Sequence, residues 1–397
     1  MENILHKVNS RFISVSEDEI CRNNKILESV VKVLVKENMV SVDRVFKSMF
    51  RRVFYGGSYF DGLHVSRNYD YDLDLLLVMP KAASPDLQQS EFPSHIQLQV
   101  NDASWLRTSP VYSKFKNTFL DDDNYLITDK ALNWMKGIVQ KGFNRLPCIS
   151  GTHYLLTKVG KFPIYFSESG PAVTLHIDVD GDCRIDVDLV VSFVFTEDKW
   201  PEGISPNPYA KWITWLGTTT HLNEFFIVAK KPKDVPDYFL PERHWRLSFH
   251  EQERQLIAQK GRLKPVGRLL KKMKKRQQHD QIASYYIKTV LLFMVEQRND
   301  AFWQQSLSRV FLDTLETYSK YIRDKKIPYY WNDEYNLIGH IDDSTLTNFA
   351  YRLEYIINKI KISPNKPDTV VEYLLSAREL EEFYSEGLNK PSSCTIF

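Results

Sequence analysis

An alternation of aspartate with apolar residues between positions 70 and 78 constrains this chain more than any other feature. The run reads DYDLDLLLV and predicts a buried strand, in which alternate residues share a face. Asp70, Asp72 and Asp74 would then point one way, and the residues between them the other. Aspartate is depleted in strands, and carboxylates on one face repel each other unless a positive charge lies between them. The fold must therefore supply a partner for these carboxylates.

A second strand is predicted at residues 184–191, RIDVDLVV, where Asp186 and Asp188 share a face. Two adjacent strands can deliver three carboxylates to a pair of Mg²⁺ ions, because hard cations prefer oxygen ligands. This is the arrangement that two-metal phosphoryl transfer requires. Taken singly, Asp74 and Asp186 are interpreted as solvent-facing strand residues, and both stay outside the catalytic set.

The triplet Gly56-Gly57-Ser58 precedes the acidic strand. Glycine lets the backbone approach an anion closely, and the backbone N–H groups together with the Ser58 hydroxyl can hold a phosphate. Such a triplet is a weak signal alone. Ahead of an acidic strand, this triplet, which we call the Gly-Ser turn, indicates a site for a phosphate-bearing substrate.

The overall composition, 43% hydrophobic and 26% charged residues, excludes a collagen, a disordered tail or a membrane protein. No run of 18 or more uncharged apolar residues is present, and the first residues lack the apolar stretch of a signal peptide. We therefore expect a reduced, cytoplasmic protein. The cysteines are too far apart in sequence for a disulfide framework or a clustered zinc site: Cys21, Cys148, Cys183 and Cys394.

A formal net charge of +2 hides a strongly basic block. Residues 227–289 carry 16 Lys/Arg and six Asp/Glu, a local net of +10. Within it, residues 260–276, which we call the basic segment, contain nine Lys or Arg and no acid. The alternative is a solvated helix face, but a run of like charges repels itself, which favours a bound polyanion. The expected nucleic-acid-binding residues are Lys260, Arg262, Lys264, Arg268, Lys272, Lys274, Lys275 and Arg276.

The pattern of elements changes near residues 200–210. Strand patterns and helices share the first part, whereas long amphipathic segments dominate after Pro201, which predicts an α+β lobe followed by a mostly helical lobe. Residues 80–110, rich in Pro, Ser and Gln, are expected to form a surface excursion. The expected helices are 16–38, 42–53, 130–141, 246–260, 281–297, 303–323, 342–360 and 366–384, and the expected domains are 1–205, 206–388 and a flexible tail at 389–397.

A Gly-Ser turn, an acidic-x-Asp pair and a third acid on a later strand follow one another in an order that resembles the nucleotidyltransferase superfamily of DNA polymerase beta. The spacing of twelve residues from Ser58 to Asp70, followed by DYD, resembles its cyclic GMP–AMP synthase branch. Three further motifs resemble that branch: FIVAK at 226–230, WRLSF at 245–249 and SYYIKT at 284–289. The resemblance covers about residues 50 to 360.

The resemblance implies a bilobal α+β fold, with a mixed β-sheet lobe, a C-terminal helical lobe and an active site between them. It implies that Asp70 and Asp72 bind both metal ions, Mg²⁺ or Mn²⁺, and that Asp188 is the third catalytic ligand. Trp245 and Tyr285 are alternatively core aromatics. The nucleotide-binding residues implied are Gly57 and Ser58 for the triphosphate, Arg246 and Ser248 for a nucleobase, Tyr285 for stacking, and Lys230, Lys271 and Ser284 for phosphates.

The vertebrate DNA-sensing synthase carries a zinc insertion shortly after the WRLSF motif, and this chain has no counterpart. Phe249 leads to Lys260 without a cysteine, and a structural zinc needs about four N or S ligands. We therefore expect no structural zinc and a pattern similar to the invertebrate cyclic GMP–AMP synthase-like receptors, which include sensors of double-stranded RNA. Such a duplex would be bound by shape and in a salt-sensitive manner.

The function implied by the resemblance is an enzyme that joins ATP and GTP into a cyclic dinucleotide and releases pyrophosphate. Double-stranded RNA would switch it on, and the product would act on a cyclic-dinucleotide receptor in an innate antiviral response. A linear oligonucleotide synthetase of the oligoadenylate type shares the Gly-Ser turn and the acidic pair but not the WRLSF motif. A catalytically silent nucleic-acid-binding module of the same fold is a further alternative, and the intact Asp70, Asp72 and Asp188 argue against it.

Two short motifs stand apart from this pattern. Residues 178–182, DVDGD, superficially resemble a calcium loop but lack the Gly at position six and the Glu at position twelve, which favours a hairpin between two strands. The last four residues, CTIF, fit a prenylation box at Cys394. No polybasic stretch or second cysteine lies just upstream, so we expect membrane attachment only if Cys394 is prenylated.

Overall fold

The computed structural model divides the chain into two compact units. The sheet unit comprises Val15–Asp61 and Arg67–Gln255, and the helical unit comprises Met1–Ser14, Gly62–Ser66 and Leu256–Phe397. The structure describes all residues except 66–68, 84, 102–103, 105–107, 170–171, 182, 202–210, 212–222, 233–234, 364–365 and 389–397.

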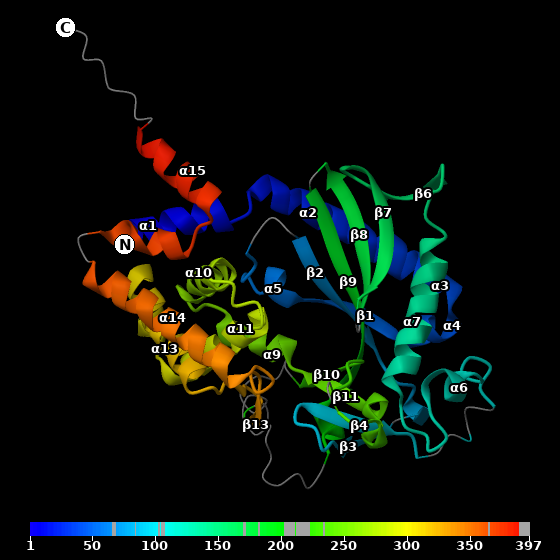
Figure 1. The fold of residues 1–397 in the computed structure, drawn as a ribbon. Coiled ribbons are helices and arrows are strands. Elements are labelled where there is room, and N and C mark those ends of the chain that lie inside the picture. The colour runs from blue at the N-terminus through cyan, green and yellow to red at the C-terminus, as the bar shows by residue number, and fades with distance from the viewer. Residues whose placement is uncertain are drawn as a thin grey trace. The chain divides into compact units, whose positions relative to one another are not determined.

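Eleven strands of the described residues form one mixed sheet, which confirms the predicted α+β fold (Figure 1). The acidic strand β2 (Tyr69–Leu77) pairs antiparallel with β1 (Phe50–Gly56) and parallel with the long strand β9 (Cys183–Thr196). The other strands follow in the order β3 (Asp86–Gln89), β4 (His95–Gln99), β11 (His244–Ser248), β10 (Glu224–Val228), β9, β8 (Ala172–Asp180), β7 (Gly160–Ser169), β6 (Thr152–Thr157) and β5 (Cys148–Ile149).

Strand β9 forms the predicted hairpin with β8, in which Asp180 lies opposite Cys183 and Gly181 has a positive φ of 38°. Asp182, the last residue of the DVDGD motif, lies outside the described residues. The core of the sheet is apolar around the acidic strand, because Leu73, Leu75 and Leu77 are fully buried. The alternation of β2 therefore separates a buried apolar face from a face that carries aspartates.

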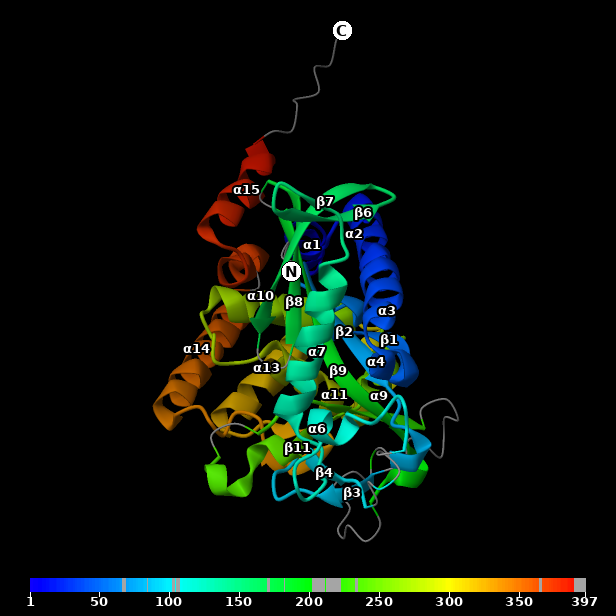
Figure 2. The ribbon, with the colours of Figure 1, turned by 90° about the vertical axis from the view of Figure 1, so that its right-hand side faces the viewer.

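Helices of the sheet unit pack on the strands that carry the acidic residues. Helix α2 (Glu17–Ser29) begins with the predicted capping box of Ser16 and Glu19 and continues into a π-helical segment, Val30–Met39. Helix α7 (Thr128–Phe143) packs on that segment and on β8 and β9 (Figure 2). The shorter helices of this unit are α3 (Val40–Val42), α4 (Arg44–Met49), α5 (Gly57–Phe60), α6 (Phe115–Phe119) and, at its end, α9 (His250–Ile257).

Several predicted elements of this unit were wrong in extent. The helix expected at 42–53 ends at Met49, because the residues after it pair with β2 as strand β1. The excursion expected at 80–110 contains β3 and β4, which pair with each other, and β4 also pairs with β11. The helix expected at 246–260 begins only at His250, since the WRLSF motif is largely strand β11. Sequence periodicity in these short segments fits both helix and strand.

The helical unit is built around α13 (Leu307–Arg323), which packs against four other helices, α1, α10, α11 and α14 (Figure 1). The helix expected at 366–384 is two elements, a 3₁₀ segment at Pro367–Tyr373 and α15 (Ala377–Leu388). The remaining helices and strands are α1 (Glu2–Val8), α10 (Leu263–Arg276), α11 (Ser284–Gln297), α12 (Asp300–Trp303), α14 (Asp343–Ile362), β12 (Pro328–Tyr329) and β13 (Asn332–Asn336).

The predicted domain boundary at 205/206 falls among residues that the structure does not describe, and the two compact units divide the chain between Gln255 and Leu256, within α9. Cys394 and the tail 389–397 also lie outside the described residues. Within the described part of the chain, every helix is too short or too polar to cross a membrane.

Candidate active site

The parallel pairing of β2 with β9 brings the predicted carboxylates side by side. Asp72 lies opposite Asp188, and Asp70 lies opposite Asp186. Neighbouring strands are about 4.8 Å apart, and residues in register on the same face are neighbours. The two acidic strands are therefore adjacent, as the sequence predicted.

These carboxylates lack enough positive charge around them. Burial, helped by the negative charges of Asp188 and Asp74 and opposed by His250, raises the pKa of Asp72 to about 6. Burial also raises the pKa of Asp70, with contributions from Asp186 and Asp188. A raised carboxyl pKa means that the ionised form is disfavoured where it stands. This face of the sheet is thus a place where a cation would be stabilised.

The two aspartates of β9 differ in their partners. Asp188 Oδ1 accepts a hydrogen bond of 2.5 Å from the Thr174 hydroxyl on β8. Asp186 is paired with Arg184 at 2.8 Å and with His176 Nδ1 at 2.6 Å. The charge of Asp186 is therefore compensated within the sheet, whereas Asp188 has a neutral donor. Sequence reasoning missed Thr174 and His176, although they alternate with apolar residues along β8.

Asp74 is not the solvent-facing residue that its alternation suggested. Its side chain is buried, 3% exposed as a residue, and pairs with His250 Nδ1 at 3.2 Å. The Ser192 hydroxyl lies at 3.5 Å from its Oδ1. A buried carboxylate requires such partners, because an unpaired charge is costly to remove from water. The interpretation of Asp74 as exposed was therefore wrong, and its place outside the catalytic set remains a prediction.

The donor set fits a divalent cation by its chemistry. Asp70, Asp72 and Asp188 offer carboxylate oxygens, the ligands that Mg²⁺ and Mn²⁺ prefer, in a partly buried position with raised pKa values at Asp70 and Asp72. Among the residues that the structure describes, no three His, Cys, Asp or Glu side chains are gathered closely enough to hold a metal ion as they stand. The fit thus rests on the register of the strands and on the uncompensated charge.

The Gly-Ser turn lies directly against the acidic strand. Gly56 is opposite Asp72 in the β1–β2 pairing, and Gly57 has a φ of +75° and begins α5. A Cβ at Gly57 would overlap the Asp72 carboxylate, whereas a Cβ at Gly56 would lie 3.5 Å from Asp74 Oδ2, an ordinary contact. Position 57 therefore requires glycine for two independent reasons, its backbone conformation and its closeness to Asp72. Ser58 follows in the first turn of α5.

Helix α9 contacts this region through residues that sequence reasoning missed. His250 pairs with Asp74, and Arg254 pairs with Asp61, the residue after α5, at 3.2 Å. Arg254 also donates to the backbone oxygen of Tyr55, just before the Gly-Ser turn, at 2.5 Å. Nothing in an isolated amphipathic segment distinguishes these side chains from ordinary surface residues.

Of the three remaining residues implied for the sheet unit, two lie on β11 and one follows β10. Arg246 and Ser248 share a face of β11, and β11 is separated from β9 only by β10. Ser248 is buried, and its hydroxyl has no hydrogen-bond partner among the described residues. Lys230, half-buried, follows β10. Trp245 is fully buried and its indole N–H donates to the Leu126 oxygen at 2.9 Å, so it is a core residue.

The other implied nucleotide-binding residues belong to the helical unit. Lys271 Nζ donates to the backbone oxygen of Leu63 at 2.9 Å. Ser284 is exposed at the start of α11, and the half-buried Tyr285 ring lies 6.3 Å from the Tyr329 ring. The structure therefore brings together Gly57, Asp72 and Asp188 within the sheet unit. Lys271, Ser284 and Tyr285 belong to the helical unit.

Most cations of the basic segment already have partners within the helical unit. Lys260 pairs with Asp300 and Lys272 with Glu379. Five others donate to oxygens of the same unit: Arg262 to Gln305, Arg268 to Asn9, Lys271 to Leu63, Lys274 to Ile282 and Arg276 to Leu375.

Burial lowers the pKa of Arg268 and of Lys274, which shows that these side chains are partly desolvated. Lys275 is exposed and has no ion-pair or hydrogen-bond partner among the described residues. The basic segment is thus less available to a polyanion than its charge suggested.

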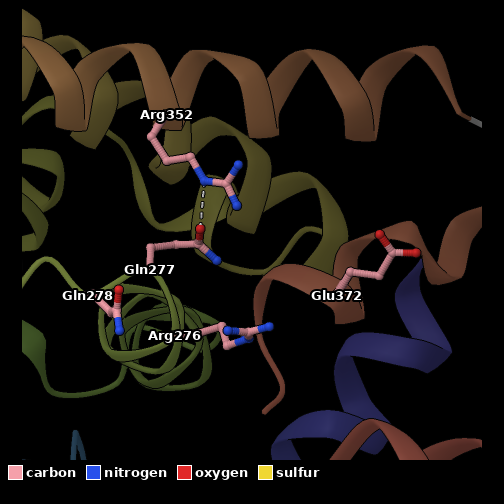
Figure 3. A pocket seen from close by; sticks show the side chains of 5 residues that line it. All are labelled: Arg276, Gln277, Gln278, Arg352 and Glu372. Carbon is pink, nitrogen blue, oxygen red and sulfur yellow. Dashed lines mark hydrogen bonds between the residues drawn. The ribbon is translucent and has the colours of Figure 1, made fainter. Parts of the chain in front are cut away.

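The end of α10 lines a polar cavity of about 270 Å³ (Figure 3). Arg352 Nε donates to Gln277 Oε1 at 2.8 Å, and the Gln277 amide donates to the Tyr373 oxygen at 3.1 Å. These bonds hold the lining side chains in place. The lining residues are Arg276, Gln277, Gln278, Arg352 and Glu372.

Comparison with known proteins gives two family matches and several full-length relatives. Residues 59–259 match the Mab-21 protein nucleotidyltransferase domain, and residues 262–355 match the Mab-21 protein HhH/H2TH-like domain. Nucleotidyltransferases of this fold generally use Mg²⁺ or Mn²⁺.

Curated relatives from three insects carry the name cyclic GMP-AMP synthase-like receptor. The protein from Tribolium castaneum is 44% identical over the whole of both chains. The protein from Aethina tumida is 33% identical, covering 98% of this chain and 94% of its own. The protein from Ctenocephalides felis is 28% identical, covering 95% and 88%.

Proposed function

We propose that this chain, which belongs to the Mab-21 nucleotidyltransferase family and, within it, to the cyclic GMP-AMP synthase-like receptors, joins ATP and GTP into a cyclic dinucleotide. The observation that carries the proposal is the register that sets Asp72 opposite Asp188, with Gly57 against Asp72. Carboxylates for divalent cations and a glycine turn for a triphosphate are the parts that phosphoryl transfer needs, since it depends on positioning and charge stabilisation.

Asp70, Asp72 and Asp188 are proposed as the catalytic carboxylates that would hold Mg²⁺ or Mn²⁺. When bound, such ions lower the pKa of an attacking ribose hydroxyl and neutralise charge on the transferred phosphoryl group. The hydroxyl of Thr174 holds one oxygen of Asp188 in place. Gly57 and Ser58 would receive the triphosphate, because backbone N–H groups at a glycine turn bind phosphate oxygens.

The remaining implied residues are assigned to the nucleotides and to an activator. Arg246 and Ser248 would read a nucleobase, and the buried, unpartnered hydroxyl of Ser248 leaves a hydrogen bond to be made. Tyr285 would stack on a base, and Lys230, Lys271 and Ser284 would contact phosphates. These roles follow from the resemblance of their motifs to the family.

Double-stranded RNA is the proposed activator, and the cyclic product would act on a cyclic-dinucleotide receptor in innate antiviral defence. Lys275, which is exposed, and Lys264 are the basic-segment residues best placed to contact a duplex, because the others are engaged within the helical unit. Neutralising phosphates with a few exposed lysines gives binding that weakens as salt rises.

The direct test is to incubate the purified chain with ATP, GTP, Mg²⁺ or Mn²⁺ and double-stranded RNA, and to separate the products by chromatography. A cyclic dinucleotide resists phosphatase, because it has no terminal phosphate, whereas a linear product keeps a 5′-triphosphate that phosphatase removes. We expect a phosphatase-resistant product that depends on RNA and is absent from Asp72→Asn. Linear oligomers would favour the oligoadenylate-type alternative, and no product with any duplex would contradict an enzymatic function.

A further inference from the structure

Arg254 of α9 contacts the chain on both sides of the Gly-Ser turn. Its Nη2 donates to the backbone oxygen of Tyr55, the residue before Gly56, at 2.5 Å. Its Nε donates to Asp61 Oδ1, just after α5, at 3.2 Å. The guanidinium carbon also lies 4.7 Å from the centre of the Phe54 ring, a cation–π contact. The Arg254 side chain therefore connects β1, which precedes the Gly-Ser turn, to Asp61, which follows α5.

The Asp61 end of this arrangement is buried and connected to the turn itself. Asp61 is only 4% exposed, so its carboxylate needs a cationic partner. Its backbone N–H donates to the Gly57 oxygen at 3.2 Å. Arg254 is thus connected to Gly57 through Asp61.

The Gly-Ser turn has little of its own to keep it in one conformation. Two consecutive glycines have the largest conformational freedom of any residues, and Gly57 occupies a positive φ. The helix that follows, α5, has four residues, far fewer than an isolated helix needs for stability. The pairing of Gly56 with Asp72 holds one end of the turn, and contacts from outside the turn help to hold Gly57 and Ser58.

We propose that Arg254 is a positioning residue that holds the Gly-Ser turn in the geometry that receives a nucleoside triphosphate. This inference rests on the proposed function. Arg254 acts through the Tyr55 oxygen and Asp61 and does not itself contact the substrate. Its loss should weaken the binding of the triphosphate group and leave the binding of the base and ribose unchanged, because those are assigned to residues of other elements.

The test is an equilibrium titration of the full chain with ATP and, separately, with AMP at a fixed Mg²⁺ concentration. Arg254→Met should weaken ATP binding about tenfold or more and change AMP binding less than twofold. Arg254→Lys, which can reach one acceptor but not both, should recover part of the loss. The double variant Arg254→Met/Asp61→Asn also removes the carboxylate charge that the single variant leaves without Arg254, and it should lose ATP affinity to the same degree.

Arg52→Met is the matched control. Arg52 also joins β1 to α9, pairing with Glu224 at 3.2 Å and Glu251 at 2.8 Å, and its side chain is 35% exposed against 31% for Arg254. Arg52 lies before the Gly-Ser turn and its ion pairs are with Glu224 and Glu251, so ATP and AMP binding should both stay within twofold. A loss of ATP affinity in this control equal to that in Arg254→Met would assign the effect to β1 packing in general and overturn the inference.

Three other results would overturn the positioning role. If the affinities for ATP and AMP fall together in Arg254→Met, Arg254 has a general structural role. If the affinity for ATP is unchanged, Arg254 has no role in binding ATP. Recovery of ATP affinity in the double variant would show that the loss in Arg254→Met came from the charge of Asp61 in the absence of Arg254. If the protein without substitutions binds ATP but makes no cyclic product, only the proposed product is contradicted. If it does not bind ATP, the proposed function and this inference are both contradicted.

Discussion

The two charged regions of this molecule differ in how far their charges are compensated. The carboxylates of β2 and β9 lie side by side on adjacent strands. The pKa values of Asp70 and Asp72 are raised because burial and like charges disfavour ionisation. The basic segment has more charge in sequence, yet Lys260 and Lys272 are paired with carboxylates and five others donate to oxygens of the same unit. Uncompensated charge, rather than the amount of charge, marks the place where a ligand is needed.

The largest effect is expected from removing one of the uncompensated carboxylates. Asp72→Asn should lower kcat/KM by about a hundred- to a thousandfold or more, because the charge that would hold the cations is lost. Product formation measured by chromatography checks this. Asp186→Asn is the matched control on the adjacent strand. Asp186 is already paired with Arg184 and His176, so its loss should change the rate only a few-fold. Equal losses in both variants would contradict the distinction.

The next effect comes from placing a methyl group beside Asp72. Gly57→Ala sets a Cβ into the Asp72 carboxylate at a positive φ, so we expect a roughly tenfold to hundredfold loss of activity and a destabilisation of about 1–3 kcal/mol. Gly56→Ala is its neighbour control, because its Cβ would have only ordinary contacts. Kinetics and chemical denaturation measure both. A Gly57→Ala variant as active as Gly56→Ala would show that the turn does not need to approach Asp72 closely.

The same carboxylate should destabilise the fold at neutral pH. The folded-state pKa of Asp72, about 6, lies above its ordinary value of 3.8, so the folded protein holds the proton more tightly than the unfolded chain. The penalty is fully present above pH 6, shrinks as the pH falls from 6 to 4, and is absent below pH 4. Without divalent cations, Asp72→Asn should therefore stabilise the protein by up to about 3 kcal/mol at pH 7.5 and hardly at pH 4.

Thermal or denaturant unfolding of the two proteins at both pH values checks this prediction. Mg²⁺ should stabilise the unchanged protein more than Asp72→Asn, because a bound cation relieves the repulsion only where the carboxylate is present. A variant that is less stable than the unchanged protein at pH 7.5 would show that Asp72 is already compensated.

The smallest effects are expected from substituting two lysines of the basic segment, of which one is ion-paired and the other is exposed. Lys272 is paired with Glu379, so Lys272→Gln should lower stability by about 1 kcal/mol and leave RNA affinity nearly unchanged. Lys275 is exposed, so Lys275→Gln should leave stability within about 0.5 kcal/mol. It should also weaken double-stranded RNA binding a few-fold and reduce the salt slope by about one.

Binding titrations over a range of salt concentrations, paired with unfolding curves, measure both lysine variants. The reverse assignment, with RNA affinity lost in Lys272→Gln and kept in Lys275→Gln, would show that the duplex displaces Glu379 and that compensation does not decide which cations are available.

The sequence alone predicts the acidic strand well and its surroundings poorly. The alternation of Asp70 and Asp72 and the later pair at Asp186 and Asp188 indicate two strands with carboxylates on one face, and β2 and β9 are those strands. The same alternation cannot separate Asp74 from Asp72, because the burial of Asp74 depends on His250, which arrives from α9 far along the chain.

Charge compensation is equally invisible in a linear sequence. Lys272 and Lys275 stand in the same basic run, and only the tertiary fold brings Glu379 to one and not to the other. Arg254 carries no local signal for the same reason, since Asp61 lies 193 residues away in the sequence. Periodicity and motifs predict the secondary structure of a segment, whereas pairing between residues far apart in the sequence decides what its side chains contact.

The central claim, that the uncompensated carboxylates of β2 and β9 bind divalent cations, is tested most directly by titrating Mn²⁺ into the protein and following free Mn²⁺ by electron paramagnetic resonance. The titration is run with and without a non-hydrolysable ATP analogue. We predict that the protein without substitutions and Asp186→Asn deplete free Mn²⁺ alike, and that Asp72→Asn and Asp188→Asn bind Mn²⁺ at least about tenfold more weakly. Equal Mn²⁺ binding by all four proteins, or none by the unchanged protein in either condition, would contradict it.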